Sequence, residues 1–213
     1  MKTDAPALPA LGIDLGGSKI EARLFDAARR ELWRERIATP RSDYGATLAA
    51  IAGLVERARV QAPGAAPTIG IGTPGSAGAL GRIKNANSTC LNGHTLQADL
   101  ERLLGQPIAL ANDANCLALS EAIDGAGAGA RTVFAVILGT GVGAGIAVDG
   151  RVLGGPNGLG GEWGHNPLPG PADDERPGPL CYCGRQGCVE AWLSGPALAA
   201  DHARHGGTAL DAA

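Results

Sequence analysis

Aromatic residues are scarce in this sequence: two Phe, two Tyr and three Trp make up 3% of its 213 residues. A core with so few large rings must be packed from Ala, Leu, Val and Ile, which favours small, closely packed elements. Charged residues are also few, at 18%, and the formal net charge is −3. Because no basic stripe is present, nucleic acid is excluded as the main partner.

The sequence also lacks a long apolar run and a signal peptide. Residues 1–17, MKTDAPALPALGIDLGG, place one lysine, an aspartate and two prolines before a short apolar stretch. That pattern fits neither a secretion signal nor a membrane span, so we expect a cytoplasmic protein with no membrane contact. In a reducing compartment the five cysteines are not expected to form disulfides, and thiolates bound to a metal are the better interpretation.

Glycine and proline are abundant, at 34 and 14 residues, which indicates many tight turns in one large domain or two small ones. Alternating apolar residues predict strands, and apolar spacings of three and four predict helices. The expected strands are 10–15, 19–25, 31–38, 68–75, 107–112, 132–138, 144–148 and 151–153. The expected helices are one capped by Ser42 or Asp43, one over 95–104 and one over 113–125.

A hairpin with a glycine-rich tip occurs twice, at residues 14–19 (DLGGSK) and 139–143 (GTGVG). Each opens a set of strands, so the sequence predicts a duplicated architecture. The Gly/Ala-rich segment 124–131 suits a connection between domains 1–125 and 126–213, although a surface loop would have the same composition.

Both turns suit the binding of phosphate. Gly16 and Gly17 can bring backbone N–H groups close to an anion, with Asp14 beside a hydrated Mg²⁺. A Gly-Gly turn between strands is often only a turn, but two such turns favour a nucleotide held from both sides. The candidate phosphate-binding residues are Asp14, Gly16, Gly17, Ser18, Lys19, Gly139, Thr140, Gly141 and Gly143.

Asp113 stands where an expected strand hands over to an expected helix. It can serve simply as the helix cap. The positive end of the helix also favours its ionised form, and such a carboxylate can accept the proton of an attacking hydroxyl.

Three cysteines lie within eight positions in CYCGRQGC, and a histidine precedes them in GEWGHNPLP. Cys181, Cys183, Cys188 and His165 match the four-coordinate Cys₃His set of structural Zn²⁺. Buried thiols are the alternative, but apolar packing does not account for this spacing among Gly, Arg and Gln. A zinc clamp would hold the segments bearing Glu162 and Glu190 in one geometry. The remaining cysteines, Cys90 and Cys116, are expected to be packing residues.

Six segments occur in the order IDLGGSK, KNANST, ANDANC, LGTGVGAG, GEWGHNPLP and CYCGRQGCVE. Together they resemble the ROK family of bacterial sugar kinases and repressors, most nearly its fructokinase (mannofructokinase) branch. The resemblance runs from about residue 10 to about residue 200. It implies an α/β protein of the duplicated actin/hexokinase-type (ribonuclease H-like) fold, with two βββαβα-type domains around a cleft.

The resemblance also implies the partners and the roles of the site residues. ATP with Mg²⁺ would lie between the glycine turns, a hexose in the cleft, and a homodimer is expected. By position, Asp113 would be the catalytic base. The residues implied to bind the sugar are Asn87, Asn112, Asp113, Glu162, His165 and Glu190. His165 would bind zinc through one ring nitrogen and a sugar hydroxyl through the other.

The expected reaction is phosphorylation of fructose, or mannose, at the 6-hydroxyl, and the alternative is a glucokinase or N-acetylglucosamine kinase. A sugar-responsive repressor is disfavoured because only about ten residues precede the first strand. A zinc-stapled binding module without activity is a third interpretation. Two departures from the family stand out: Ser18 replaces the more usual threonine, and the 213 residues fall short of about 300, leaving the second domain incomplete.

Overall fold

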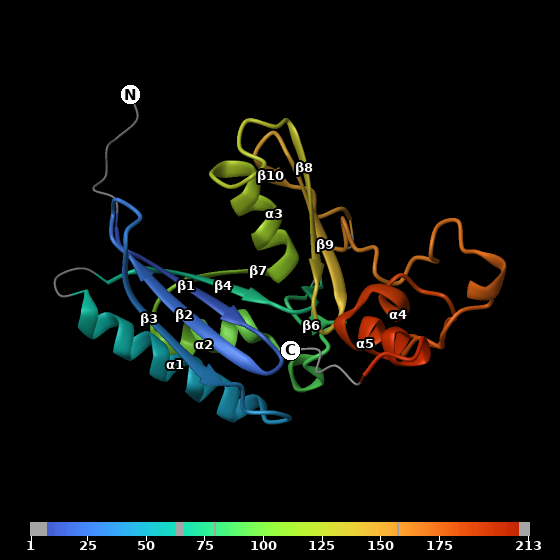
Figure 1. Ribbon diagram of the computed structural model, residues 1–213. Helices are drawn as coiled ribbons and strands as arrows, with labels where there is room; N and C mark the ends of the chain where they lie inside the picture. The colour runs from blue at the N-terminus through green and yellow to red at the C-terminus, as the bar shows by residue number, and fades with distance from the viewer. Residues whose placement is uncertain (1–7, 63–65, 79, 157, 209–213) are drawn as a thin grey trace. The chain divides into compact units, whose positions relative to one another are not determined.

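The computed structural model describes residues 8–62, 66–78, 80–156 and 158–208 (Figure 1). The chain forms two compact units, Met1–Asp113 and Ala114–Ala213. The division falls twelve residues before the one expected at 125/126, because helix α3 (Asp113–Ile123) packs Leu117, Ala118 and Ala122 against the sheet of the second unit. No helix among the described residues has the length and apolar character needed to cross a bilayer.

The first unit contains a five-stranded mixed sheet in the order β3-β2-β1-β4-β7. Strands β1, β4 and β7 are mutually parallel, whereas β2 pairs antiparallel with β1 and β3 pairs antiparallel with β2. The strands are β1 (Ala10–Leu15), β2 (Lys19–Phe25), β3 (Glu31–Ala38), β4 (Thr68–Thr73) and β7 (Ile108–Asn112). Every expected strand of this unit is therefore present.

Helices α1 (Tyr44–Gln61) and α2 (Leu96–Leu104) pack against this sheet, on the same side of it in Figure 1. The alternation predicted for β2 holds in part: Ile20 and Leu24 are fully buried as expected, but Glu21, expected on the exposed face, is buried too. Asp43, not Ser42, caps α1: its carboxylate accepts a hydrogen bond from the backbone N–H of Ala46 at 2.9 Å.

Three short elements of the first unit were not predicted. They are the two-stranded pair β5 (Ser76–Ala77) and β6 (Ile83–Lys84), and the 3₁₀ turn η1 (Thr89–Leu91). Elements of two or three residues leave too little periodicity to be recognised in a sequence.

The second unit opens with the three-stranded antiparallel sheet β10-β9-β8. Its strands are β8 (Thr132–Leu138), β9 (Val142–Val148) and β10 (Arg151–Val152). Long loops follow, with η2 (Asp173–Glu175), and then α4 (Glu190–Leu193) and α5 (Gly195–Arg204). Strand β8 is an edge strand, and Phe134, Val136 and Leu138 on one of its faces are exposed, as expected of an incomplete sheet.

Candidate functional site

The carboxyl ends of the parallel strands bring several predicted site residues of the first unit together. Asp14 on β1 lies opposite Gly72 on β4, and Thr73 on β4 lies opposite Asn112 on β7. The Asn112 side-chain amide donates a hydrogen bond to the Gly75 carbonyl at 3.0 Å. Strand ends of this kind are where α/β proteins place their ligands.

The first glycine turn is closed by its own backbone. The Gly16 N–H donates to the Lys19 carbonyl at 3.0 Å, so it is not available to a phosphate, contrary to the prediction for this residue. Thr39 supports the turn through its hydroxyl, which donates to the Gly16 carbonyl at 2.7 Å. The N–H groups of this turn that remain candidates for phosphate binding are therefore those of Gly17 and the residues after it.

Asp14 and Glu21 are paired across strands β1 and β2 but have opposite pKa shifts. Partial desolvation, reinforced by the Glu21 charge, raises the pKa of Asp14. Burial would likewise raise the pKa of Glu21, but hydrogen bonds from Arg23, Arg36 and Arg34 outweigh it and lower the value to about 2. Asp14 is thus the acid of the pair whose ionised form a nearby cation would stabilise more.

Asp113 is the first residue of α3, directly after the last residue of β7. A carboxylate in the first turn of a helix is stabilised by the helix dipole, which favours the ionised form that a proton acceptor needs. Asn87 is exposed in the loop after β6, and its neighbour Ser88 places a hydroxyl near the first glycine turn: a Cβ added at Gly17 would lie 3.4 Å from the Ser88 Oγ.

The second glycine turn is tied to the segment that carries Glu190. The Gly139 N–H donates to the Gly141 carbonyl at 2.9 Å, which closes the turn as in the first unit. The Glu190 carboxylate accepts from the Val142 N–H at 2.9 Å. A Cβ at Gly141 would lie 2.7 Å from the same carboxylate, so any larger residue there would displace the Glu190 side chain. Glu190 is thereby held against the turn predicted to bind phosphate.

The four predicted zinc ligands come together in the second unit. The ligand atoms of His165, Cys181, Cys183 and Cys188 all lie within 4.8 Å of one another. The Sγ atoms of Cys183 and Cys188 are 3.7 Å apart, and the Cys181 Sγ is 3.5 Å from the His165 Nδ1. A tetrahedral Zn²⁺ with bonds of 2.3 Å to sulfur places neighbouring sulfurs about 3.8 Å apart, so the cluster fits this ion.

The local backbone explains how distant residues form one cluster. The Val189 N–H donates to the Asn166 carbonyl at 2.9 Å, and the Glu190 N–H to the Gly164 carbonyl at 2.8 Å, so the histidine segment runs beside the last cysteine. Cys181 and Cys183 lie in one turn, which is closed by a hydrogen bond from the Cys181 N–H to the Arg185 carbonyl at 2.8 Å. These backbone hydrogen bonds bring the two segments side by side.

The thiols differ in how readily they ionise. Hydrogen bonds from the Arg185 backbone and side chain lower the pKa of Cys183 to about 6, whereas burial raises the pKa of Cys188. Zinc requires thiolates, so a bound ion would have to supply the charge that stabilises the buried Cys188 in its ionised form.

The two ring nitrogens of His165 face different partners. Nδ1 points to the cysteine cluster, and Nε2 lies 3.0 Å from the Tyr182 hydroxyl. Partial desolvation of the hydroxyl and then the charge of Glu190 raise the pKa of Tyr182 to about 12, although most of the side chain is exposed, so this hydroxyl stays protonated. The nitrogen expected to bind a sugar hydroxyl thus already has a hydroxyl beside it.

Glu162 is exposed in the glycine-rich loop that precedes His165. The loop lies directly on strand β9, since a Cβ added at Gly164 would collide with the Val142 carbonyl. This contact fixes the loop on the sheet while its acidic side chain stays accessible.

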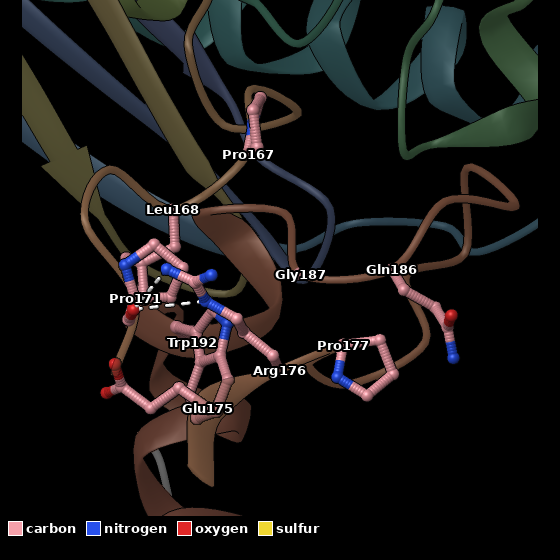
Figure 2. Close-up of a pocket in the computed structure, with 9 residues that line it drawn as sticks. All are labelled: Pro167, Leu168, Pro171, Glu175, Arg176, Pro177, Gln186, Gly187 and Trp192. Carbon is pink, nitrogen blue, oxygen red and sulfur yellow. Dashed lines mark hydrogen bonds between the residues drawn. The ribbon is translucent and has the colours of Figure 1, made fainter. Parts of the chain in front are cut away.

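A small pocket of about 100 Å³ lies beside the cysteine cluster (Figure 2). Arg176 closes part of its wall by donating two hydrogen bonds to the Pro171 carbonyl, at 3.2 and 2.9 Å. Its lining consists of Pro167, Leu168, Pro171, Glu175, Arg176, Pro177, Gln186, Gly187 and Trp192. None of these was predicted to bind a ligand, and the volume is below the roughly 300 Å³ of ordinary small-molecule sites. We interpret it as a packing gap.

Three polar side chains next to the predicted residues were missed. They are Thr39, which supports the first turn, Ser88, which lies near Gly17, and Tyr182, which contacts His165. Tyr182 carried a usable signal, because one of only two tyrosines in the chain stands between two candidate zinc ligands. The other two depend on loop packing that no sequence spacing reveals.

The mixed sheet of the first unit, the two glycine-tipped hairpins and the Cys₃His cluster together define a protein of the actin/hexokinase-like class. Comparisons with known proteins extend this result. The model of the ROK family matches residues 10–212. The chain belongs to the ROK family.

Two curated relatives are kinases of amino sugars. The N-acetyl-D-glucosamine kinase of Pectobacterium atrosepticum is 41% identical over 189 residues, which is 86% of this chain and 62% of the relative. The N-acetylgalactosamine kinase AgaK of Shewanella sp. is 41% identical over 191 residues, which is 88% of this chain and 61% of the relative. The chain thus spans about three fifths of the length of these relatives, and the predicted fructokinase branch is not confirmed.

A solved structure agrees with the fold. The ROK family glucokinase from Streptomyces griseus, in complex with glucose and AMPPNP, has a TM-score of 0.75 and 33% sequence identity, covering 90% of this chain and 59% of the other. The actin/hexokinase-like α/β fold expected from the resemblance is therefore confirmed.

Proposed function

We propose that this chain contains the acceptor-binding and phosphate-binding part of an ATP-dependent hexose kinase whose acceptor is an N-acetylated hexosamine, N-acetylglucosamine in the first place. The observation that carries the proposal is the 41% identity over 189 residues to an N-acetyl-D-glucosamine kinase. N-acetylgalactosamine is the second candidate acceptor, supported by the equal identity to AgaK.

In the proposed reaction, Asp113 accepts the proton of the attacking sugar hydroxyl. The hydroxyl oxygen forms a bond to the γ-phosphorus of ATP, and the bond from this phosphorus to the bridging oxygen breaks, so that ADP leaves. In the first turn the residues from Gly17 to Lys19 contribute backbone N–H groups to the phosphates. In the second turn the N–H groups of Gly139 and Val142 are already hydrogen-bonded, so Thr140, Gly141 and Gly143 take this role. Mg²⁺, with Asp14 near its water shell, supplies charge neutralisation when bound.

The sugar is held by hydrogen bonds from side chains that can both donate and accept. An array of carboxylates, amides and an imidazole discriminates between hydroxyl patterns, because an unmatched polar group in the site is costly. The residues proposed for this role are Asn87, Asn112, Glu162, His165 and Glu190. Zinc on the cysteine cluster and His165 would have a structural role, bracing the two segments that carry Glu162 and Glu190.

The test is a coupled assay of ADP release with MgATP and N-acetylglucosamine, N-acetylgalactosamine, glucose or fructose. We expect the highest kcat/KM with N-acetylglucosamine. A higher value with fructose would refute the proposed acceptor, and no ADP release with any sugar would refute the kinase.

Asp113→Asn is the matched variant. It should reduce kcat by about a hundredfold to ten-thousandfold, the usual contribution of a positioned general base, with fold and zinc content unchanged. Asp149→Asn, which removes an exposed carboxylate in the hairpin between β9 and β10, serves as the control and should retain activity. Loss of folding in Asp113→Asn would show that the residue acts mainly as a helix cap.

A further inference from the structure

The Nε2 atom of His165 has only one hydrogen bond to give. When a histidine ligates a metal through Nδ1, the ring proton resides on Nε2, which then donates to a single acceptor. In this structure the Nδ1 atom faces the Cys181 sulfur, 3.5 Å away, and the Nε2 atom faces the Tyr182 hydroxyl, 3.0 Å away. A second hydroxyl can bond to Nε2 only if the phenol leaves.

The Tyr182 side chain can move away from His165 at a small cost in free energy. It belongs to the tight turn between two cysteines, and it is 79% exposed. Its ring meets the imidazole edge to face, with centroids 5.1 Å apart and planes at 83°. Exposed side chains change rotamer within nanoseconds, and moving this ring to solvent uncovers little further apolar surface.

The phenol also lies next to the Glu190 carboxylate, whose charge acts on it. The Tyr182 side chain therefore lies beside both His165 and Glu190, two of the residues proposed to bind sugar hydroxyls. A hydroxyl on a rigid six-membered ring is chemically what a pyranose would present to the same two groups.

We propose that Tyr182 is a displaceable occupant of the sugar subsite: its phenolic oxygen holds the position at His165 Nε2 that a sugar hydroxyl takes on binding. This inference rests on the proposed sugar-binding function. Tyr182 sets sugar affinity by competition, and its hydroxyl has no part in phosphoryl transfer.

The test is isothermal titration of the zinc-loaded 213-residue chain with N-acetylglucosamine, without nucleotide, for the wild type and Tyr182→Phe. Phenylalanine keeps the ring contact with His165 and removes only the competing hydroxyl. We expect the dissociation constant to fall by about threefold to tenfold, the size of one net hydrogen bond. Tyr44→Phe removes the only other phenol, which donates to Asp99 at 2.7 Å, and should leave the constant unchanged.

An unchanged or larger dissociation constant in Tyr182→Phe, with wild-type sugar binding intact, would overturn the inference alone. If neither protein binds any sugar, the proposed function fails and the displacement fails with it. Nitrogen-15 NMR of the His165 ring supplies a readout independent of sugar. The Nε2 resonance of the free protein should shift in Tyr182→Phe at equal zinc content, and an unshifted resonance would show that the contact does not form in solution.

Discussion

Glu21 is a buried carboxylate of the first unit that is paired with three arginines. It is 8% exposed and receives hydrogen bonds from Arg23 at 2.7 Å, Arg34 at 3.2 Å and Arg36 at 2.5 Å. A buried carboxylate needs such partners, since ionising it without them would be costly. Its role is to fasten strands β2 and β3 beside the strand that carries Asp14.

This pairing makes the stability of the first unit depend on pH. Because the folded-state pKa of Glu21 is lowered from 4.5 to about 2, its contribution is complete above about pH 4.5 and is lost as the pH falls towards 2. Glu21→Gln should lower the free energy of unfolding by about 2 kcal/mol at pH 7, the value of charge-assisted hydrogen bonds. Thermal unfolding at pH 7 and pH 3 measures both effects.

The difference between wild type and Glu21→Gln should shrink at pH 3, where the wild-type carboxylate has lost part of its advantage. Glu56→Gln is the control, because Glu56 pairs with Arg59 on the surface of α1 and its side chain is 65% exposed. That pair should contribute less than about 1 kcal/mol. A Glu21→Gln difference as small as the control, or equal at both pH values, would contradict the assignment.

At the scale of elements, the loop that carries Cys181, Cys183 and Cys188 depends on glycines that bring its backbone segments close together. A Cβ at Gly178, which has φ of +82°, would lie 2.6 Å from the Gly187 Cα. Gly184, with φ of +85°, has nothing within 4 Å of its added Cβ. The two positions share a left-handed conformation and differ in the space around them.

Gly178→Ala should therefore weaken zinc binding by about tenfold more than Gly184→Ala, because only the first adds a collision to the cost of the conformation. Titration of each variant with zinc against a competing chelator measures the difference. Equal losses in the two variants would show that the conformation, and not the contact between Gly178 and Gly187, controls the site.

Elements with a clear period could be predicted from the sequence, and those without one could not. The burial of Ile51, Val55 and Ala58 follows from their spacing along α1. Helix α5 was not predicted, although the Ser194 side chain caps it and a proline lies in its first turn. Its apolar face is only partly buried, and its sequence lacks the clear apolar spacing that indicates a helix. The phenol beside His165 could not be predicted, since it depends on how a turn of irregular backbone folds onto a loop.

At the scale of the whole molecule, the duplication predicted from the sequence lets the two units be compared element by element. Both have a glycine-tipped hairpin closed by its own backbone hydrogen bonds. In the first unit β1 also pairs in parallel with β4. Its counterpart in the second unit, β8, pairs only with β9 among the strands that the structure describes. The exposed Phe134, Val136 and Leu138 mark the face that further elements would cover in a sheet built like the first.

The glycine turns predicted a duplicated architecture and the cysteine spacing predicted the clustering of the candidate zinc ligands, because both are local signals, whereas the fold class was implied by the family resemblance. The branch of the family was harder to predict. Acceptor choice depends on the shape of a pocket assembled from loops, and the sugar-binding residue types are those that any hexose requires. The fructose prediction therefore depended on resemblance alone, and the relatives favour N-acetylated hexosamines.

X-ray absorption at the zinc edge of the purified chain tests the central claim most directly, that His165 and the three cysteines hold one zinc ion. The account predicts one bound zinc per chain with three sulfur neighbours at about 2.3 Å and one nitrogen at about 2.0 Å. A spectrum with only oxygen and nitrogen neighbours, or a protein that retains no zinc after purification, would contradict it.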